Sequence, residues 1–454
     1  MGKRRILIFL LIILFHLFLL KSINFFPYPE LFVYSYLTSK GFLPYAQIFD
    51  QHFPGLVFSP INLYSLGMMT PQRIALFHFA FICISHLFLF KISQKMFKGW
   101  LIFLPNLLYL IWQPYFEGYV FWIDSFITPF LLASFYYLFS DKKINLFVSG
   151  ILLGFAFTCK QVVLPLIFLL ILYLFLIRRK GIFIFLLGLS LPLLIMLLYI
   201  LKIGVWKEFY YWTITYNLTT FAYLGRKLPT LSLLLRAGLV FFIGSIAWFT
   251  VIYKNAKKGA TLLGIFGFAS LFFTFARFDY IHLQPSLPFF LLMIVLLFSR
   301  LSMRLKILFG AFYLLTSLLL ISRFYIIMRG SKVYFFGNLE KEVAMEVRKL
   351  TKPAEKVFAL GTLPHLYYLS ERLPPGGIFA FQFPWVMVVA EERILLGLIS
   401  DPPALVVRDT KAQVDDNLNI ISFIPEIHKY VEENYLLYKR IGESTEILIK
   451  REKL

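Results

Sequence analysis

The sequence predicts a multi-span α-helical membrane protein with about 11 transmembrane helices and a small C-terminal extracytoplasmic α/β domain. Three observations support this. Of 454 residues, 59% are hydrophobic and 15% are charged, and the mean hydropathy is +0.77, which is more apolar than a soluble globular domain. Apolar runs long enough to cross a bilayer, which takes about 20 residues, recur along most of the chain. After Arg329 the acidic residues typical of soluble proteins return.

Eleven apolar segments account for the expected spans. The first follows Lys3-Arg4-Arg5 and resembles a signal peptide, but no small-residue cleavage site comes after it, so we expect a retained span. The segments are 6–21, 73–94, 99–114, 119–139, 144–159, 161–177, 181–202, 232–253, 259–276, 283–299 and 305–328.

The formal net charge of +21 is interpreted as a topology signal, because Lys and Arg gather in short patches between apolar runs and cytoplasmic loops are enriched in them. With a cytoplasmic N-terminus, every expected inner loop is basic, namely 91–98, 141–143, 178–180, 254–258 and 300–306. An odd number of spans then places the C-terminal residues outside the cytoplasm. We therefore expect an integral protein of the cell (inner or plasma) membrane.

Two domains are expected. Residues 1–329 would form the transmembrane domain, including a long first outer loop at 22–71, and residues 330–454 the soluble α/β domain. In the latter, 339–350 and 427–438 have helical spacing, and 356–360 and 404–408 resemble short buried strands. This part shows no Gly-rich phosphate loop and no nucleophile elbow, so we expect it to support the site or bind an acceptor.

The first outer loop is far longer than a simple connection, and such loops are usually functional. Residues 30–40 predict an interfacial helix along the membrane surface, flanked by Glu30 and Asp50, with His52 close behind. Two interpretations stay open. Glu30 could simply favour a helix N-terminus and Asp50 cap a turn, or one of them could be a general base for a substrate at the membrane surface.

Residues 41–55 (GFLPYAQIFDQHFPG), preceded by an apolar span, an acid and a helix, resemble the first periplasmic loop of GT-C glycosyltransferases. That family includes protein O-mannosyltransferases and lipid A aminoarabinose transferases. Its catalytic carboxylate opens the surface helix, often as Asp-Glu followed closely by Tyr, whereas this chain has Glu30 alone and then Tyr34. Asp50 matches the second acid of the family's loop. The resemblance thus implies Asp50 or Glu30 as catalytic residue, with Asp50 the better match.

Residues 150–161 (GILLGFAFTCKQ) are similar to the family's Gly-rich span ending in Lys, which places Lys160 at the outer surface. A Lys there could pair with a lipid phosphate or merely extend its charge to the interface. Gln161 and Pro165, at the start of the next apolar run, indicate a tight turn that would hold Lys160 in place.

Residues 277–288 (RFDYIHLQPSLP) resemble the family's entrance to a late span. The resemblance implies donor-phosphate binding by Arg277 and His282 together with Lys160, and Tyr280 as a supporting residue. Arg suits bidentate phosphate contacts. The alternative is an ordinary interfacial belt of Arg, Tyr and His.

Glu117 and Asp124 lie near the outer end of the fourth expected span. A carboxylate inside an apolar helix is costly and needs a partner or a cavity. Asp124 is therefore either part of the site or one half of a buried pair with an outer cation.

The resemblance implies an inverting glycosyltransferase, a hexosyl or pentosyl transferase that takes its sugar from a polyprenyl-phosphate donor. The acceptor would be a lipid, polysaccharide or protein hydroxyl outside the cytoplasm. We expect membrane lipids but no nucleic acid as partners and no certain cofactor, with a divalent metal left open. A transporter or flippase of lipid-linked sugars is the alternative, although such proteins show repeated halves and midplane polar sites. A third interpretation is an envelope scaffold or sensor.

Overall fold

The computed structural model describes residues 3–140, 142–254, 258–361, 363–414 and 418–451. Asp141 and residues 255–257, which belong to two of the expected basic loops, lie outside this range. The chain divides into two compact units. Unit 1 comprises Met1–Pro27, Gln72–Leu197 and Lys227–Lys332, and unit 2 comprises Tyr28–Pro71, Leu198–Arg226 and Val333–Leu454.

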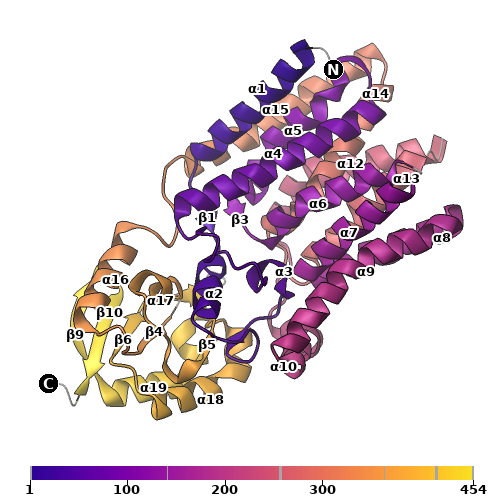
Figure 1. Ribbon diagram of the computed structural model, residues 1–454. Helices are drawn as coiled ribbons and strands as arrows, with labels where there is room; N and C mark the ends of the chain where they lie inside the picture. Colours follow the sequence, from indigo (N-terminus) through magenta and orange to yellow (C-terminus); the bar gives the residue numbers. More distant parts are fainter. Residues whose placement is uncertain (1–2, 141, 255–257, 362, 415–417, 452–454) are drawn as a thin grey trace. The chain divides into compact units, whose positions relative to one another are not determined.

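Each of the eleven apolar segments contains one α-helix in the described residues (Figure 1). Proline stands in the first turn of α8 and α14, where its missing N–H has no helical partner in any case. The helices are α1 (Lys3–Lys21), α4 (Pro71–Met96), α5 (Leu104–Gln113), α6 (Ile123–Leu138), α7 (Lys143–Cys159), α8 (Leu164–Ile177), α9 (Arg179–Lys202), α12 (Leu231–Lys254), α13 (Lys258–Ala269), α14 (Leu287–Arg300) and α15 (Met303–Met328).

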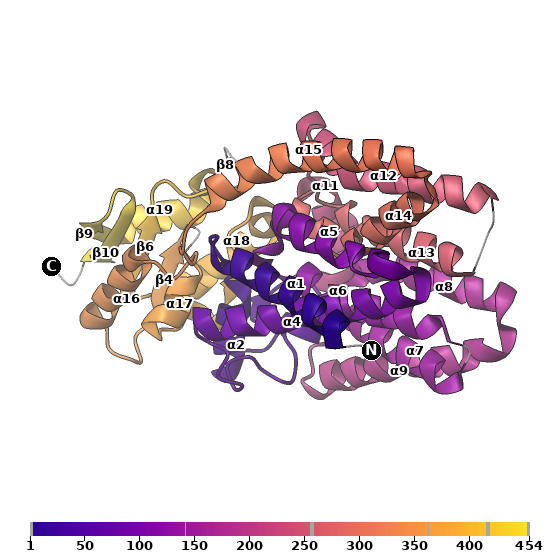
Figure 2. The same ribbon diagram turned by 90° about the horizontal axis from the view of Figure 1, so that it is seen from above.

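Within unit 1, α6 packs on α7, α14 lies between α12 and α5, and α15 lies along α12 at the edge of the bundle (Figure 2). By length and composition, four described helices could cross a membrane: Pro71–Met96, Arg179–Lys202, Leu231–Ile252 and Met303–Met328. Other apolar helices are 10–17 residues long. A membrane helical fold is therefore supported, while the count of about 11 spans remains a prediction.

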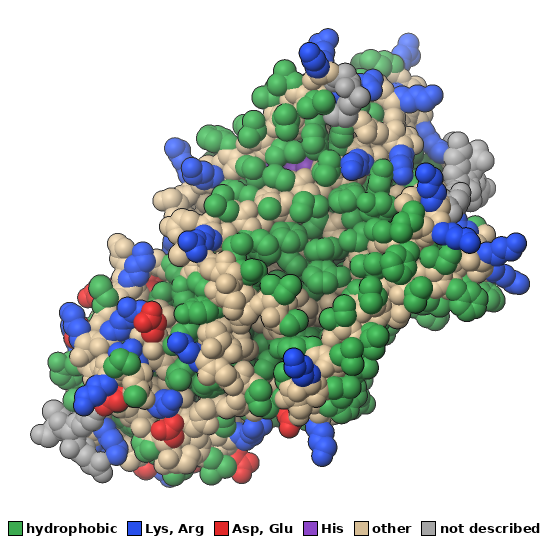
Figure 3. Space-filling view, in the orientation of Figure 1, with side chains coloured by type: hydrophobic (Ala, Val, Ile, Leu, Met, Phe, Trp, Pro, Cys, Tyr) green, Lys and Arg blue, Asp and Glu red, His purple; other side chains and the backbone are tan. Residues whose placement is uncertain are grey.

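The surface of these helices is strongly apolar (Figure 3). On α15, for example, Leu308, Leu315 and Leu319 are each more than 60% exposed. Large exposed apolar areas are rare on soluble monomers, so this surface suits a lipid environment.

A chain of buried polar side chains joins α1, α4 and α5. Asn106 Nδ2 lies 2.9 Å from His86 Nδ1, His86 Nε2 lies 2.7 Å from His16 Nδ1, and His16 Nε2 lies 3.0 Å from Gln113 Oε1. Gln113 then donates through Nε2 to the carbonyl oxygen of Gly118 at 3.1 Å. We call these residues the histidine chain. All four polar side chains are fully buried. Their mutual contacts offset part of the cost of burying polar groups, while Asn106 Oδ1 has no hydrogen-bond partner among the described residues.

Unit 2 contains a four-stranded sheet of order β4-β6-β10-β9, in which β4 and β6 are parallel and the remaining pairs antiparallel. The predicted helix at 339–350 and the predicted strands at 356–360 and 404–408 are confirmed. The elements are α16 (Asn338–Leu350), β4 (Val357–Leu360), α17 (His365–Ser370), α18 (Pro384–Ser400), β6 (Leu405–Asp409), β7 (Gln413–Val414), β8 (Leu418–Asn419), α19 (Pro425–Asn434), β9 (Tyr435–Ile441) and β10 (Thr445–Lys450).

The expected helix at 427–438 was wrong at its end. Helix α19 stops at Asn434, and Tyr435 opens β9, which pairs with β10. Pairing along the sheet edge satisfies backbone groups that a longer helix would use. The helical spacing of residues 427–438 did not indicate that strand pairing would end the helix early.

The first outer loop belongs to unit 2. It contains α2 (Glu30–Ser39), β2 (Ile48–Phe49) and α3 (Pro54–Val57), and β2 pairs in parallel with β5 (Phe379–Ala380). Helix α2 exists as predicted, and every residue from Glu30 to Leu37 is buried within the protein. Its position along the membrane surface stays a prediction. It packs against α17 of the same unit. Residues 198–226 add α10 (Trp206–Tyr210), two π-helical turns and α11 (Ala222–Leu224).

Candidate active site

A cluster of Glu30, Tyr34, Asp50 and His52 occupies the first outer loop, and we call it the Asp50 cluster. Glu30 and Tyr34 lie one turn apart on α2, and Asp50 follows β2 directly. Because residues four apart share a helix face, both α2 side chains can turn toward the end of this strand.

Asp50 accepts hydrogen bonds at both carboxylate oxygens. Tyr34 donates its hydroxyl to Oδ2 at 2.7 Å, and the backbone N–H of His52 donates to Oδ1 at 2.6 Å. The Nδ1 atom of His52 also lies 2.9 Å from Oδ1. The bond from His52 N–H is the turn cap expected as one alternative. The tyrosine and imidazole contacts go beyond a cap and fix the orientation of the carboxylate.

Glu30 is buried, and its Oε2 has no hydrogen-bond partner in the described chain. Burial, and then the negative charge of Asp50, raises the pKa of Glu30 from 4.5 to about 8. Glu30 is therefore mostly protonated at neutral pH, and in that form it cannot accept a proton from an acceptor hydroxyl.

Aromatic rings surround the Tyr34 side of the cluster. The ring of Phe58 stacks on Tyr34 with centroids 4.9 Å apart, and Phe379 and Phe381 meet it edge to face. Such surroundings exclude water and strengthen the electrostatic interactions within.

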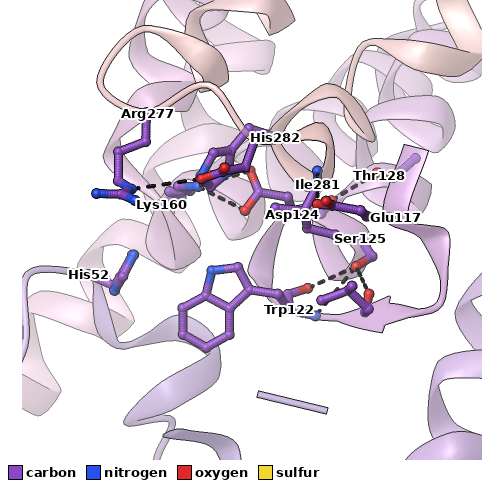
Figure 4. A network of polar contacts seen from close by, with 12 residues as sticks. His52, Glu117, Trp122, Asp124, Ser125, Thr128, Lys160, Arg277, Ile281 and His282 are labelled. Carbon is purple, nitrogen blue, oxygen red and sulfur yellow. Dashed lines mark hydrogen bonds and ion pairs between the residues drawn. The ribbon is translucent and has the colours of Figure 1, made fainter. Parts of the chain in front are cut away.

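A second cluster, the Lys160 cluster, joins Asp124, Lys160 and His282 in unit 1 (Figure 4). Lys160 Nζ donates to Asp124 Oδ1 and Oδ2 at 2.9 and 2.8 Å. His282 Nδ1 lies 3.1 Å from Asp124 Oδ1 and 3.3 Å from Lys160 Nζ. Asp124 stands in the first turn of α6, Lys160 directly after α7, and His282 in the short helix η7 (Tyr280–Leu283).

Further charged groups adjoin η7. Asp279 pairs with Lys227 at 3.0 Å, and its Oδ2 lies 3.8 Å from Arg277 Nε. Glu117 accepts the N–H of Ile281 at 2.8 Å. Burial, and then the charge of Asp279, raises the pKa of Glu117 to about 7.

Tyr280 and Gln161, two further predicted residues, take structural positions. Tyr280 donates its hydroxyl to the carbonyl oxygen of Leu233 at 3.1 Å. Gln161 opens a 3-10 turn immediately after Lys160, as the expected tight turn requires. Lys160 itself is only 7% exposed and paired with Asp124. This is the buried ion pair expected as one alternative for Asp124, and it rules out extension of the Lys160 side chain into the interface.

No group of three or more His, Cys, Asp or Glu side chains arranged to hold a metal ion was found within the described ranges.

Comparison with solved structures identifies the fold. ArnT from Cupriavidus metallidurans bound to undecaprenyl phosphate superposes with a TM-score of 0.67 at 13% sequence identity, over 99% of this chain and 98% of that one. The archaeal oligosaccharyltransferase AglB from Archaeoglobus fulgidus, in complex with an inhibitory peptide and a dolichol-phosphate, gives a TM-score of 0.56 at 11% identity, over 100% and 75%. The chain has the fold of GT-C glycosyltransferases. No protein-family model and no curated protein sequence matches it.

Two features of this GT-C fold were missed by sequence reasoning. Tyr34 was seen only as part of a motif, and its bond to Asp50 depends on the path of the loop between them. Gln284 donates through Nε2 to the carbonyl oxygens of Gln113 and Phe116, which fastens η7 to the π-helical turn η2 (Pro114–Gly118). An amide at the start of an apolar helix was the only available signal for Gln284.

Proposed function

We propose that the protein is a membrane glycosyltransferase that moves a sugar from a polyprenyl-phosphate donor to an acceptor hydroxyl on the extracytoplasmic face, with inversion at the anomeric carbon. The fold supports the class of reaction. The ArnT and AglB structures contain undecaprenyl phosphate and dolichol-phosphate, respectively, which supports a lipid-phosphate donor here.

The observation that carries the assignment of the base is the contrast between Asp50 and Glu30. A general base must accept a proton at the working pH. Glu30, with its pKa raised to about 8, is largely protonated at pH 7, whereas Asp50 is oriented by Tyr34 and His52. Asp50 is therefore the proposed base. Glu30 belongs to the same cluster as a neutral carboxyl group.

Asp50 takes the proton of the acceptor hydroxyl while that oxygen bonds to the anomeric carbon of the sugar. The bond between this carbon and the phosphate oxygen breaks, and the lipid phosphate leaves with the electron pair. Cationic and N–H groups stabilise such a leaving group, and we assign this role to Arg277, His282 and Lys160. Asp124 would orient the last two.

The test is sugar transfer by the full-length protein in lipid nanodiscs, supplied with a panel of radiolabelled polyprenyl-phosphate sugars and a crude envelope fraction as acceptor. Asp50→Asn is expected to slow transfer roughly 10²- to 10⁴-fold, as for loss of a general base. Glu30→Gln should retain far more activity at pH 7. Glu342→Gln, an exposed acid on α16, is the matched control.

Three results would count against the proposal. Unchanged transfer by Asp50→Asn would remove Asp50 as the base. A retained anomeric configuration in the product would exclude direct inversion. Consumption of no donor across the panel, combined with movement of labelled lipid between leaflets, would replace the transferase with a flippase.

A further inference from the structure

A pocket opens at one edge of the sheet in unit 2. Its volume is about 190 Å³, and its lining includes Glu340, His365 and Asp409. Strands β4 and β6 run parallel, His365 follows β4, and Asp409 is the last residue of β6. The pocket thus lies at the carboxyl ends of two parallel strands, which is where open α/β sheets commonly bind ligands.

The charge of this pocket is opposite to that of the whole chain. The protein has a formal net charge of +21, yet none of the described residues that line the pocket is Lys or Arg. Glu340 and Asp409 contribute two carboxylates. Asp409 Oδ1 accepts the backbone N–H of Lys411 at 3.1 Å, but neither carboxylate forms an ion pair within the described part of the chain. Some other acids of unit 2 are paired, for example Glu443 with Lys411 at 2.8 Å. The pocket therefore offers uncompensated negative charge.

His365 adds a second, independent observation. Its side chain lines the pocket, is only 5% exposed, and has an Nδ1 atom with no hydrogen-bond partner among the described residues. Burial lowers its pKa to about 4, so the ring is neutral and one ring nitrogen can accept a hydrogen bond. Buried polar atoms without partners are few in native proteins, and a bound donor would satisfy this one.

Phe335 lies beside the imidazole, with ring centroids 5.5 Å apart. Its backbone has φ +68°, a conformation that bulky residues rarely adopt, which costs energy that the surrounding structure must offset. An aromatic face attracts cations. Ser444 and Thr445 complete the polar part of the lining.

We propose that this pocket binds a primary ammonium group carried on a frame the size of a monosaccharide or an extended side chain. The ammonium would donate hydrogen bonds to Glu340 and Asp409 and lie near the ring of Phe335. Phosphates and carboxylates are unsuited because no cation lines the pocket, and the described residues offer no metal-binding group. The inference concerns binding alone, so it stands or falls independently of sugar transfer.

The experiment titrates the full-length protein in nanodiscs, without any donor lipid, by isothermal calorimetry. Methyl glucosaminide is compared with neutral methyl glucoside, and N-acetyl-lysine amide with neutral N-acetyl-norleucine amide. At least one ammonium probe should bind tenfold or more tightly than its neutral counterpart. Which one does so identifies the frame as sugar or peptide.

Variants locate the binding. Glu340→Gln and Asp409→Asn should each weaken the binding of the ammonium probe at least fivefold. Glu443→Gln, whose carboxylate is exposed and paired with Lys411, should leave it unchanged. Glu340 is half-exposed at the start of α16, so its variant tests the site without disturbing the core. Equal binding of charged and neutral probes, or full binding by Glu340→Gln, would overturn the proposal.

Discussion

The ammonium of Lys160 donates hydrogen bonds to both carboxylate oxygens of Asp124, at 2.9 and 2.8 Å. Lys160 follows the last residue of α7, Asp124 lies in the first turn of α6, and these two helices pack together. Both side chains are almost completely buried. Each of these buried charges has lost its hydrating water. The opposite charge beside it replaces that stabilisation.

Asp124→Asn should therefore destabilise the protein strongly. It leaves the Lys160 ammonium buried without its anion, and breaking such a pair costs roughly 3–5 kcal/mol. The double variant Asp124→Leu with Lys160→Met should recover much of the loss because no buried charge is left. Thermal unfolding in detergent, followed by circular dichroism, measures both.

The matched control is the pair of Lys227 and Asp279, whose side chains are 34% and 32% exposed. Asp279→Asn should change stability by less than about 1 kcal/mol, as for surface pairs. Equal losses in the two single variants would contradict the special importance of burial at Asp124.

Glu30→Gln should stabilise the protein increasingly as the pH rises. In the folded state the pKa of Glu30 is raised from 4.5 to about 8, so between these values the folded protein holds a proton that the unfolded chain has lost. The contribution of Glu30 to the free energy of unfolding therefore falls as the pH increases from 4.5 to about 8, and it stays constant at higher pH. Gln has no such proton to lose.

The difference in melting temperature between Glu30→Gln and wild type is the quantity to measure. It should grow from pH 5 to pH 8.5 by at least about 2 °C, the shift that roughly 1 kcal/mol produces in a large domain. Glu342→Gln, which changes an exposed acid, should show no trend with pH. A constant difference for Glu30→Gln would mean that Glu30 is already ionised at pH 5.

Tyr34→Phe should reduce sugar transfer less than Asp50→Asn does, provided that the proposed base is right. It removes one hydrogen bond to Asp50 Oδ2, while the contacts of His52 with Oδ1 remain. A loss of roughly tenfold in kcat corresponds to about 1.4 kcal/mol, within the range for a hydrogen bond to a charged group. The comparison uses the transfer assay at pH 7, and a Tyr34→Phe defect as large as that of Asp50→Asn would assign Tyr34 a direct chemical role.

The positions of the helices and the types of residue in the candidate site could be predicted from the sequence. Apolar length and basic patches located a helix in every expected segment, and the GT-C resemblance is confirmed at the level of fold. Which side chains pair with each other could not be predicted from the sequence. Lys160 and Asp124 are 36 positions apart, and only the packing of α6 on α7 shows that they neutralise each other. Likewise, the burial of α2 depends on α17, which follows it in the chain by more than 300 residues.

Gly154→Ala should destabilise the packing of α7 on α9. A Cβ at Gly154 would clash with the carbonyl oxygen of Leu189, and one at Gly188 would clash with that of Phe147. Backbone atoms cannot move aside as flexible side chains do, and small residues permit such close approach of membrane helices. The expected cost is roughly 1–3 kcal/mol, measured as a lower melting temperature. Gly310→Ala, whose Cβ would meet only Phe298 at 3.6 Å, should be neutral or stabilising, and a similar loss there would argue against a specific contact at Gly154.

The histidine chain predicts the tautomer of two buried imidazoles. Asn106 Nδ2 also donates to the carbonyl oxygen of His86 at 2.9 Å, which fixes its amide as the donor to His86 Nδ1. Gln113 Nε2 donates to the carbonyl oxygen of Gly118, which leaves Oε1 as the acceptor facing His16. Every bond between them must then run in one direction, so both neutral rings carry their proton on Nε2.

Nitrogen-15 NMR of histidine-labelled protein in nanodiscs checks this assignment, since protonated and unprotonated ring nitrogens resonate far apart. His16 and His86 should each show a protonated Nε2 and an unprotonated Nδ1. His86→Leu should remove the acceptor of Asn106 and the donor to His16 together, at a cost of roughly 1–3 kcal/mol for each buried polar group left unmatched. An Nδ1-protonated ring at either position would mean that the amide of Asn106 or of Gln113 is turned the other way and that the chain runs in the opposite direction.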